Sequence, residues 1–552
     1  MTYVITQNCC NDASCVPVCP VGCIHPTPDE PGYATTEMLY IDPRACIDCG
    51  ACVEACPVDA VAAADELPLE LKGFADLNAA YYDSNRTEHR PAPVAGTVTL
   101  RNEPPLRVAV VGAGPSGFYA AEELLFNLPV PMRVSMFDRL PTPFGLVRAG
   151  VAPDHQNTKA ITDRFRRVAA HPHFSTFYNV EIGEHLSHEE LLAHHHAVIY
   201  TTGMSESRRL GIAGEDLVGS SSANEFVGWY NGNPGYANAH FDLTGTRAVV
   251  VGTGNVALDI ARILLGDIDQ LARTDIADHA LATLAASTIE QVVVLGRRNI
   301  GHAAFTSPEL LAFAACRSID VVVDPRDLAH EGDGATLAET AKVSLIADIA
   351  TLPRPGRKQL VLRFLTTPVE ILGSGRVQSV RVERNRMVTD TSGRRIAAPT
   401  GETELIDTAL VVRAIGYRGV PLPGLPFDPV TGSIPNRRGR VMDPDTNAPL
   451  PGVYTAGWIK RGPSGAIGTN GADAGETVAA LLEDHENAKL NKTIRDEKGF
   501  ADVIHRRQPH RLNRSQWQRL DEHELHRGRE ESRPRVKLVD RIEMLRIARP
   551  LT

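Results

Sequence analysis

The chain has 552 residues, which is more than a single hydrophobic core supports, so several domains are expected. Its composition is 43% hydrophobic and 22% charged, and no apolar stretch approaches the roughly 18 residues that a membrane helix needs. These values exclude a membrane-spanning or largely disordered protein. The N-terminus lacks the basic and apolar regions of a secretory signal, which predicts a cytoplasmic protein.

Charge is distributed unevenly along the chain. Residues 1–75 hold 11 acidic residues against Arg44 and Lys72, whereas residues 495–552 hold 15 basic and 10 acidic residues. We expect the basic tail to be a solvated surface, with electrostatic steering toward a partner as the alternative. Its mixed charges and single aromatic residue, Trp517, argue against nucleic-acid binding.

Nine of the ten cysteines lie in the first 56 residues, and this clustering in a large cytoplasmic chain indicates metal rather than disulfides. The segment from Cys46 to Pro57 reads Cys-x2-Cys-x2-Cys-x3-Cys-Pro. In this pattern three cysteines hold one iron–sulfur cluster and the fourth reaches a second cluster. Zinc also binds Cys-x2-Cys pairs, but four closely spaced cysteines followed by proline favour iron and sulfur.

An earlier run ends at Cys19-Pro20 and has Asp12 where a thiolate is expected. Because iron among sulfur ligands is lost most easily from an oxygen ligand, this site should hold a [3Fe-4S] cluster or a labile [4Fe-4S] cluster capped by Asp12. Its other predicted ligands are Cys9, Cys15 and Cys56. A regular [4Fe-4S] cluster would be held by Cys19, Cys46, Cys49 and Cys52. Cys10 and Cys23 are off register and are expected to be buried thiols, although Cys10 could replace Cys9 after a one-residue slip. Residues 1–65 resemble the seven-iron ferredoxins of bacteria, which carry single electrons.

A polar, proline-rich stretch at 83–105 predicts a tether, and a first nucleotide-binding unit follows it. A buried strand at 107–111 leads into Gly-x-Gly-x-x-Gly at 112–117 and then a helix, and a second strand ends at Asp138. Three glycines, Gly112, Gly114 and Gly117, would admit a pyrophosphate to the helix N-terminus, while Asp138 would accept hydrogen bonds from a ribose.

A second unit has a different ending. A strand at 247–251 precedes Gly252 and Gly254, and the partner strand at 291–295 is followed by Arg297 and Arg298. Two cations in place of an acid favour a 2′-phosphate, so this site should prefer NADP to NAD. Two different dinucleotide sites suggest one bound flavin and one diffusible nicotinamide, with the flavin domain interrupted by the NADP domain and resuming at 408.

Four stretches, 143–155, 252–259, 296–298 and 457–465, resemble the adrenodoxin reductase family of ferredoxin–NADP reductases, and the whole chain resembles its fused bacterial form. The resemblance implies an α/β fold: two Rossmann-like nucleotide-binding domains, with the NADP domain inserted in the FAD domain, preceded by a small α+β ferredoxin domain. The expected parts are the two-cluster ferredoxin domain 1–75, a linker 76–105, the first FAD part 106–205, the NADP domain 206–407, and the second FAD part with the tail 408–552.

The resemblance also implies site residues. Those expected to contact FAD are Ser116, Asp138, Leu146, Ile182, Trp458, Gly465, Ala466 and Ile467. Those expected to contact NADP are Arg208, Asn255, Val256, Arg297, Arg298, Glu309 and Gly465. With Trp458, His155 is placed in the catalytic set beside the flavin, where it would orient the nicotinamide or relay a proton; a structural histidine is the alternative. Relatives often have a second Glu where this chain has Ala312, so a role for that acid is not carried over.

We therefore expect an NADPH-dependent ferredoxin–NADP reductase that contains FAD and two clusters. Hydride would pass from NADPH to FAD, and single electrons would leave through the clusters for an external ferredoxin or cytochrome P450. The protein is expected to be a monomer without membrane or nucleic-acid partners. The alternatives are a subunit of a larger complex, such as a glutamate-synthase-like assembly, and a redox sensor. A flavin disulfide reductase is excluded because Cys316 is the only cysteine outside the N-terminal module.

Overall fold

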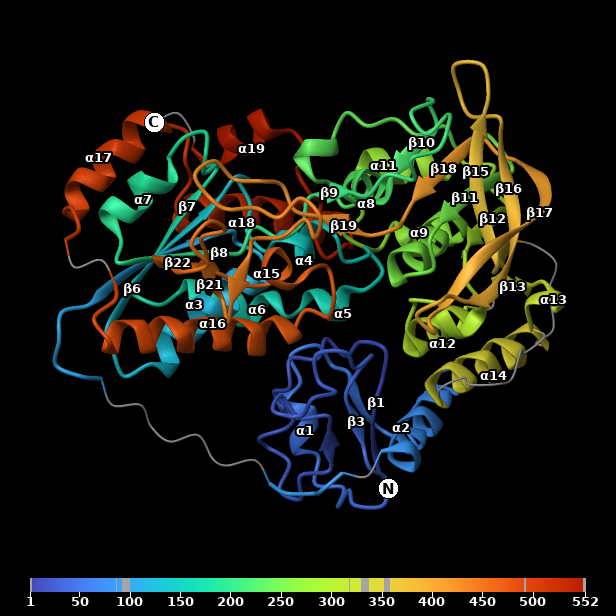
Figure 1. The fold of residues 1–552 in the computed structure, drawn as a ribbon, viewed down its shortest axis with the longest axis horizontal. Coiled ribbons are helices and arrows are strands. Elements are labelled where there is room, and N and C mark those ends of the chain that lie inside the picture. Colours follow the sequence, from blue (N-terminus) through green and yellow to red (C-terminus); the bar gives the residue numbers. More distant parts are fainter. Residues whose placement is uncertain are drawn as a thin grey trace.

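The computed structural model describes residues 2–85, 87–91, 100–316, 318–328, 337–351, 358–490 and 493–549. It shows a small N-terminal domain beneath two α/β lobes that lie side by side (Figure 1). The lobe on the left of this view contains a seven-stranded sheet, and the lobe on the right contains a six-stranded sheet. The expectation of several domains is therefore confirmed.

The N-terminal domain is built from two short antiparallel strand pairs, β1 (Tyr3–Ile5) with β4 (Val61–Ala63) and β2 (Ile24–His25) with β3 (Tyr40–Ile41). Its helices are α1 (Ala51–Ala55), the 3-10 helix Leu69–Leu71 and α2 (Gly73–Ser84).

Helix α2 corrects the predicted end of this domain at residue 75. The buried Asn78 side chain donates to the carbonyl of Ile5 and accepts from the amide of Ile41, both at 2.9 Å, so α2 belongs to the core of the domain. The beginning of the predicted linker also folds back, because His89 Nε2 lies 3.0 Å from Asp42 Oδ2. Residues 92–99 of the predicted tether lie outside the described residues.

The seven-stranded sheet has the order β20-β21-β22-β8-β5-β6-β7. Its strands are β5 (Leu106–Val111), β6 (Met132–Asp138), β7 (Phe174–Tyr178), β8 (Ala197–Tyr200), β20 (Asn436–Arg437), β21 (Arg440–Met442) and β22 (Pro449–Thr455). Its helices are α3 (Pro115–Glu122) with a π-helical turn Glu123–Asn127, α4 (Gly145–Ala149), α5 (Gln156–Lys159), α6 (Thr162–Ala169), α7 (His188–His194), α15 (Trp458–Arg461) and α16 (Thr469–Glu486). Because β22 pairs in parallel with β8, two distant segments of the chain complete one sheet.

The six-stranded sheet has the order β10-β18-β11-β12-β14-β13, with every pair parallel. Its strands are β10 (Ser220–Ser222), β11 (Arg247–Val251), β12 (Gln291–Leu295), β13 (Ile319–Val323), β14 (Lys358–Arg363) and β18 (Leu410–Arg413). Its helices are α8 (Ala223–Tyr230), α9 (Asn255–Leu265), α10 (Ile268–Leu271), α11 (Asp278–Ala285), α12 (Ser307–Ala315), α13 (Pro325–Leu328) and α14 (Leu337–Thr351), with 3-10 turns at Pro234–Tyr236 and Ile300–His302. An antiparallel sheet of β15 (Thr366–Leu372), β16 (Ser379–Thr389) and β17 (Arg395–Asp407) was not expected from the sequence.

Strand β18 corrects the predicted return to the first lobe at residue 408. It pairs with β11 and β10 of the second lobe, so the chain crosses back only after Arg413. The two crossings run antiparallel to each other as β9 (Glu206–Ser207) and β19 (Tyr417–Arg418), which form a two-stranded connector between the lobes (Figure 1).

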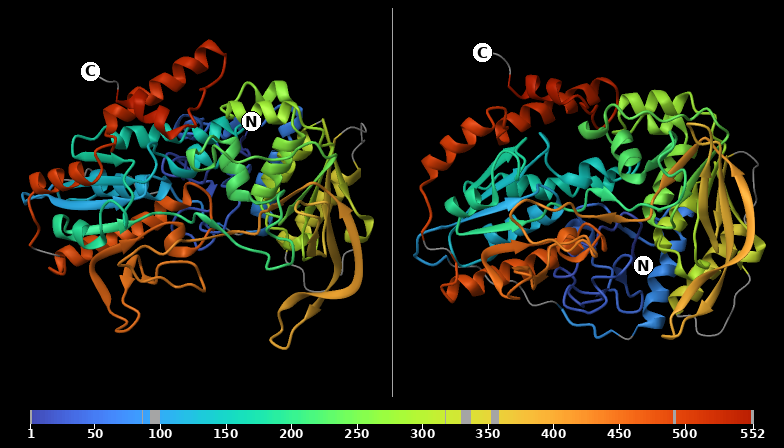
Figure 2. Two further views of the ribbon diagram at one scale, coloured as in Figure 1. Left: turned by 90° about the horizontal axis from the view of Figure 1, so that it is seen from above. Right: turned by 45° about the horizontal axis from the view of Figure 1, so that its top comes forward.

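The C-terminal tail contains α17 (Glu497–Arg507), α18 (Arg514–Glu530) and α19 (Arg541–Ala548), and its helices lie along one side of the molecule (Figure 2). Several of its charges point inward. Fully buried Glu524 pairs with Arg148 of the first lobe at 2.5 Å, and buried Lys537 pairs with Asp275 of the second lobe at 2.9 Å. The expectation of a solvated basic tail is wrong for these residues, because the tail joins the two lobes.

Candidate functional site

The loop after β5 is shaped to receive a phosphate group. Gly112 has a φ of +112°, and a Cβ atom at this position would overlap the carbonyl of Thr201. Gly114 begins α3 without a side-chain cap, which leaves the first-turn N–H groups for an anion. Asp138, at the end of β6, accepts the amides of Ala113 and Leu140 at 2.8 Å each. Burial raises the pKa of this carboxyl, whose remaining lone pairs can accept ribose hydroxyls.

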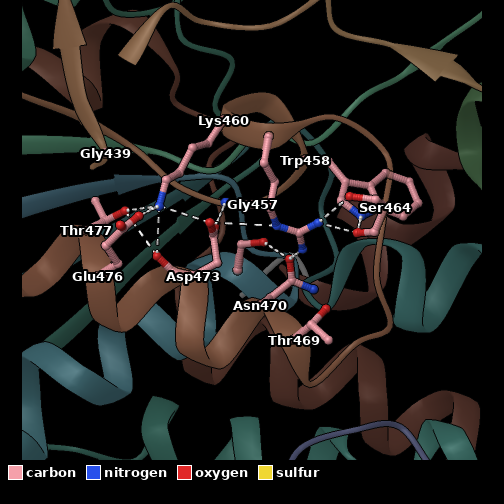
Figure 3. A network of polar contacts seen from close by, with 12 residues as sticks. Gly439, Gly457, Trp458, Lys460, Ser464, Thr469, Asn470, Asp473, Glu476 and Thr477 are labelled. Carbon is pink, nitrogen blue, oxygen red and sulfur yellow. Dashed lines mark hydrogen bonds and ion pairs between the residues drawn. The ribbon is translucent and has the colours of Figure 1, made fainter. Parts of the chain in front are cut away.

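A network of hydrogen bonds and ion pairs stabilises the segment that packs against the start of α3 (Figure 3). Ser116 Oγ donates to Asn470 Oδ1 at 2.9 Å, which joins the start of α3 to α16. Lys460 Nζ lies 2.9 Å from Asp473 Oδ1, and the amide of Gly457 donates to the same carboxylate. These contacts fix the turn between α15 and α16, which holds the predicted flavin contacts Gly465, Ala466 and Ile467.

Two of the expected flavin residues present apolar surface at this site. Leu146 is 43% exposed, and its neighbour Gly145 lies against Gly114 of the phosphate loop. The Trp458 ring stacks on Tyr417 with 5.7 Å between centroids, and its Nε1 donates to the carbonyl of Ser464 at 3.2 Å. Ile182, in contrast, is buried in the core of the lobe. An uncovered leucine and an aromatic wall beside a phosphate loop fit a flat ring system carried by a dinucleotide.

The second lobe repeats the phosphate loop. Gly252 has a φ of +122°, and Gly254 begins α9 without a side-chain cap. Asn255 Oδ1 accepts the amide of Thr306 at 2.8 Å, which positions the start of α12 and therefore Glu309. Val256, the next expected contact, packs partly buried against the core of this lobe.

The expected 2′-phosphate ligands follow β12. Arg297 and Arg298 are both exposed, and neither forms an ion pair with another described residue. Arg208 is exposed on the connector, where its amide donates to the carbonyl of Gly416 at 3.0 Å. The Nε of Arg208 also donates to the carbonyl of Tyr417 at 3.4 Å. The guanidinium groups of Arg297 and Arg298 are therefore available to an anionic ligand.

A charged cluster lies where the two lobes meet. The ligand atoms of His155, from the first lobe, and of Asp259 and Glu309, from the second lobe, all lie within 4.8 Å of one another. Arg262 contacts three carboxylates here, with Asp154 and Asp259 at 2.5 Å and Glu309 at 3.5 Å.

These contacts shift two pKa values in opposite directions. Burial raises the pKa of Glu309, and the charge of Asp259 raises it further. Burial would also raise the pKa of Asp154, but the charge of Arg262 and its hydrogen bond, together with the nearby His155, outweigh burial and hold the pKa below its usual value. The sequence predicted His155 and Glu309 but not Asp259 and Arg262, whose i, i+3 spacing on one helix was the available signal.

The cysteines form two groups in the N-terminal domain. Those predicted to hold the regular cluster, Cys19, Cys46, Cys49 and Cys52, line one small cavity. Cys23 lines it too, 3.5 Å from the sulfur of Cys19, although it was predicted to be a bystander. The hydrogen bond from Cys23 is the main cause that lowers the pKa of Cys19 to about 5. We call these four predicted ligands the outer group, because Cys49 is exposed.

The second group, which we call the inner group, consists of Cys9, Cys15 and Cys56, with Asp12 beside it. Burial raises the pKa of Cys9 to about 12, and the neighbouring charges of Cys56 and Asp12 add to this effect. Cys56 Sγ accepts the amide of Ala60 at 3.2 Å, the type of N–H···S bond that stabilises cluster sulfur. Buried thiols that resist ionisation fit a site in which bound metal stabilises the thiolates.

The inner group faces the first lobe. The amide of Gly468, at the start of α16, donates to the carbonyl of Cys10 at 2.7 Å. A Cβ atom at Gly468 would overlap the backbone of Asn11 and Asp12. The cysteine loop therefore rests directly on the turn that carries Ala466 and Ile467. Within the described chain, no helix has the length and apolarity needed to cross a membrane.

Two dinucleotide-binding lobes with a cysteine-rich domain docked beneath them define a flavoprotein oxidoreductase that uses a pyridine nucleotide and iron–sulfur chemistry. Residues 39–62 match the family model of the 4Fe-4S binding domain. The chain is 47% identical to a probable ferredoxin/ferredoxin–NADP reductase of Mycobacterium tuberculosis, over 99% of this chain and 95% of that protein. It is 39% identical to the mitochondrial NADPH:adrenodoxin oxidoreductase of Arabidopsis thaliana, over 80% of this chain and 95% of that one.

A solved structure of the NADPH-ferredoxin reductase FprA of M. tuberculosis, in complex with NADPH, matches 81% of this chain and all of that one, with 46% identity and a TM-score of 0.77. The chain belongs to the family of fused ferredoxin/ferredoxin–NADP reductases. The expected family, fold class and oxidoreductase activity are thus confirmed.

Proposed function

We propose that this protein takes hydride from NADPH, and that it passes single electrons through the inner and then the outer cysteine group to an external ferredoxin or cytochrome P450. NADPH delivers two electrons together, clusters accept one at a time, and a bound FAD supplies the conversion between the two. The names of the relatives include NADPH and ferredoxin, and they support both the electron donor and the electron acceptor of this proposal.

We assign the choice of nucleotide to Arg297 and Arg298. They stand at the end of β12 without an acidic partner in the described chain, so a 2′-phosphate would gain two charge-assisted contacts. The double variant R297Q/R298Q should raise the KM for NADPH by about a hundredfold, at roughly 1.5 kcal/mol for each contact, and should change the KM for NADH little. Equal effects on both nucleotides would refute the assignment.

We assign the charged group of side chains where the two lobes meet to the binding of the nicotinamide ring. His155 lies within reach of Asp259 and Glu309, and Arg262 balances their charge. There, His155 can orient the nicotinamide, or it can exchange a proton between its imidazole and the carboxyl of Glu309, whose pKa is raised. Trp458, which contacts Tyr417 and Ser464, would pack against the other side of the nicotinamide ring.

One observation carries the internal route: the hydrogen bond from Gly468 to the carbonyl of Cys10. The cysteine loop of the inner group therefore contacts Gly468, which follows the predicted flavin contact Ala466 by two residues in the chain. This contact supports a sequence in which electrons reach the inner group before the outer group.

We assign the delivery of electrons to the outer group. Ile47, which lines the cavity with Cys49, is 57% exposed. Val18 and Val53, the sequence neighbours of Cys19 and Cys52, are 41% and 37% exposed. The surrounding domain is strongly acidic. An apolar centre within an acidic surface fits an external acceptor that has a basic rim around an apolar centre.

Anaerobic addition of NADPH to the whole protein, followed by optical and EPR spectroscopy, tests this function. We expect the flavin to be reduced and both clusters to fill from NADPH. A reduced flavin beside clusters that stay oxidised would refute internal transfer. Steady NADPH turnover by the isolated chain with ferricyanide or cytochrome c would exclude a purely sensory role and an obligatory subunit role.

A further inference from the structure

Arg164 reaches from α6 of the first lobe into the ferredoxin domain. Its Nη1 lies 3.0 Å from Asp12 Oδ2 and 3.1 Å from Ser14 Oγ. Its Nε lies 3.0 Å from both oxygens of Glu122 on α3, and its guanidinium lies 5.2 Å from the centre of the Tyr119 ring. Contacts on three sides hold this guanidinium at the domain interface, where its side chain is 24% exposed.

Asp12 is the residue that the cysteine spacing places where a fourth iron would be held. In the docked structure its Oδ2 accepts Ser14 Oγ at 2.5 Å in addition to Arg164, while its Oδ1 accepts the amide of Ser14 at 3.3 Å. The side chain is only 7% exposed, so the ion pair is largely shielded from water. A carboxylate whose charge is shared with an arginine is a weaker ligand for iron.

We propose that docking of the ferredoxin domain controls the iron content of the inner cluster. While the domain is docked, Arg164 holds Asp12 and the Cys9, Cys15 and Cys56 site keeps a [3Fe-4S] cluster. When the domain separates from the lobe, Asp12 is free to cap a fourth iron. This inference rests on the proposed assignment of these cysteines to one cluster.

The conversion of the [3Fe-4S] cluster to a [4Fe-4S] cluster needs Fe²⁺ as its one further reactant, and its atoms and charges balance. The one-electron-reduced [3Fe-4S] core is neutral, and it takes up one Fe²⁺ to become a [4Fe-4S] core of charge 2+. No electron is gained or lost in this step, and the Asp12 carboxylate exchanges the Arg164 guanidinium for the new iron. The electron that first reduces the core comes from NADPH through the reductase activity.

Arg164 is thus a positioning residue, and the test measures iron rather than turnover. The whole protein is reduced anaerobically, incubated with increasing Fe²⁺ and reoxidised, and the EPR signal of the oxidised [3Fe-4S] cluster is then measured. R164Q should lose this signal at a concentration about tenfold lower than wild type, since one charge-assisted contact to Asp12 is gone. R164K, which keeps a cation within reach of Asp12, should recover much of the wild-type behaviour.

Arg166 supplies the matched control, because it lies on the same helix and its ion pairs among the described residues are with Asp163 and Asp521 of the reductase body. R166Q should therefore behave as wild type, and the double variant R164Q/D12N should keep its [3Fe-4S] signal at every iron concentration. Equal iron sensitivity of R164Q and wild type would overturn the proposal, as would conversion in R164Q/D12N. A wild-type protein with no [3Fe-4S] signal at all would overturn the cluster assignment itself, and the proposal with it.

Discussion

The tail and the ferredoxin domain differ in how deeply their charged contacts with the two lobes are buried. The tail is held by buried charges: the side chains of Glu524 and Lys537 are 0% and 1% exposed. The charged contacts of the ferredoxin domain are less deeply buried. The side chains of Arg164 and Asp12 are 24% and 7% exposed, and those of Lys342 and Glu37, which lie 3.4 Å apart, are 11% and 28% exposed.

This difference in burial indicates a difference in permanence. Separating a pair within the body leaves an uncompensated charge in the interior, whereas a side chain at the domain interface gains contact with water when the domain separates. The tail is therefore a fixed part of the body that keeps the two lobes in register. In our proposal, the ferredoxin domain is a docked module that can leave and return.

The largest expected effect comes from E524Q. Removing this charge leaves Arg148 and Arg535 without their buried partner, so the free energy of unfolding of the body should fall by about 3–5 kcal/mol. Denaturant titration followed by the fluorescence of Trp517, on the same helix, measures it. The exposed neighbour Glu522 is the control, and E522Q should change the value by less than about 0.5 kcal/mol. Equal effects of the two variants would contradict the claim that the tail is a fixed part of the body.

The same residue predicts a dependence on pH. Burial would raise the pKa of Glu524, but the charges of Arg148 and Arg535, together with hydrogen bonds to this carboxylate, outweigh burial and hold the pKa below its usual value. In the unfolded chain this carboxyl takes up a proton near its ordinary pKa of about 4.3, while the folded protein does not, so stability is lost as the pH falls through that range. Wild type should lose stability more steeply than E524Q below about pH 5, by up to about 1.4 kcal/mol per pH unit. Parallel stability curves for the two proteins would contradict this prediction.

A smaller effect is expected at the ferredoxin interface. Since a Cβ atom at Gly468 would overlap the backbone of Asn11 and Asp12, G468A should displace the docked domain and slow flavin-to-cluster transfer by at least about tenfold. The unfolding midpoint of the body should change little. Gly471, one turn further along α16, has room for a methyl group at 3.5 Å from Tyr119, and G471A is the control. Stopped-flow reduction by NADPH measures both variants, after their flavin content has been matched.

The smallest effect is expected on the outer face of the same domain. I47E places a charge at the exposed residue that lines the cavity with Cys49. It should slow electron delivery to an external ferredoxin by about threefold to tenfold, which corresponds to roughly 1 kcal/mol. Transfer from flavin to the clusters should not change. V430E, at a site on the first lobe that is 89% exposed, is the control. Loss of internal transfer in I47E would show that the two faces of the domain are not separate.

The sequence predicted those parts of the fold that are set by local pattern. Strands β5, β6, β11 and β12 and the glycine loops after β5 and β11 are found where they were expected, because a buried strand, a tight turn and a helix N-terminus all lie within a short segment. The four cysteines predicted to hold the regular cluster line one cavity, as the spacing of the two cysteine runs predicts.

The errors in the prediction share one cause, which is contact between distant segments. Helix α2 belongs to the ferredoxin domain because Asn78 bonds to two strands, and β18 belongs to the second lobe because it pairs with β11. The inward charges of the tail depend on Asp275 and Arg148, hundreds of residues earlier in the chain. Composition and periodicity carry no information on such partners.

Internal transfer is the central claim, and the dependence of its rate on protein concentration tests it most directly. NADPH is mixed anaerobically with the protein in a stopped-flow instrument, and the flavin-to-cluster step is followed over a wide range of protein concentrations. Because a docked domain provides its acceptor within the same molecule, the observed rate constant should be independent of concentration. A rate constant that rises in proportion to protein concentration would show that electrons pass between molecules, and it would contradict the account.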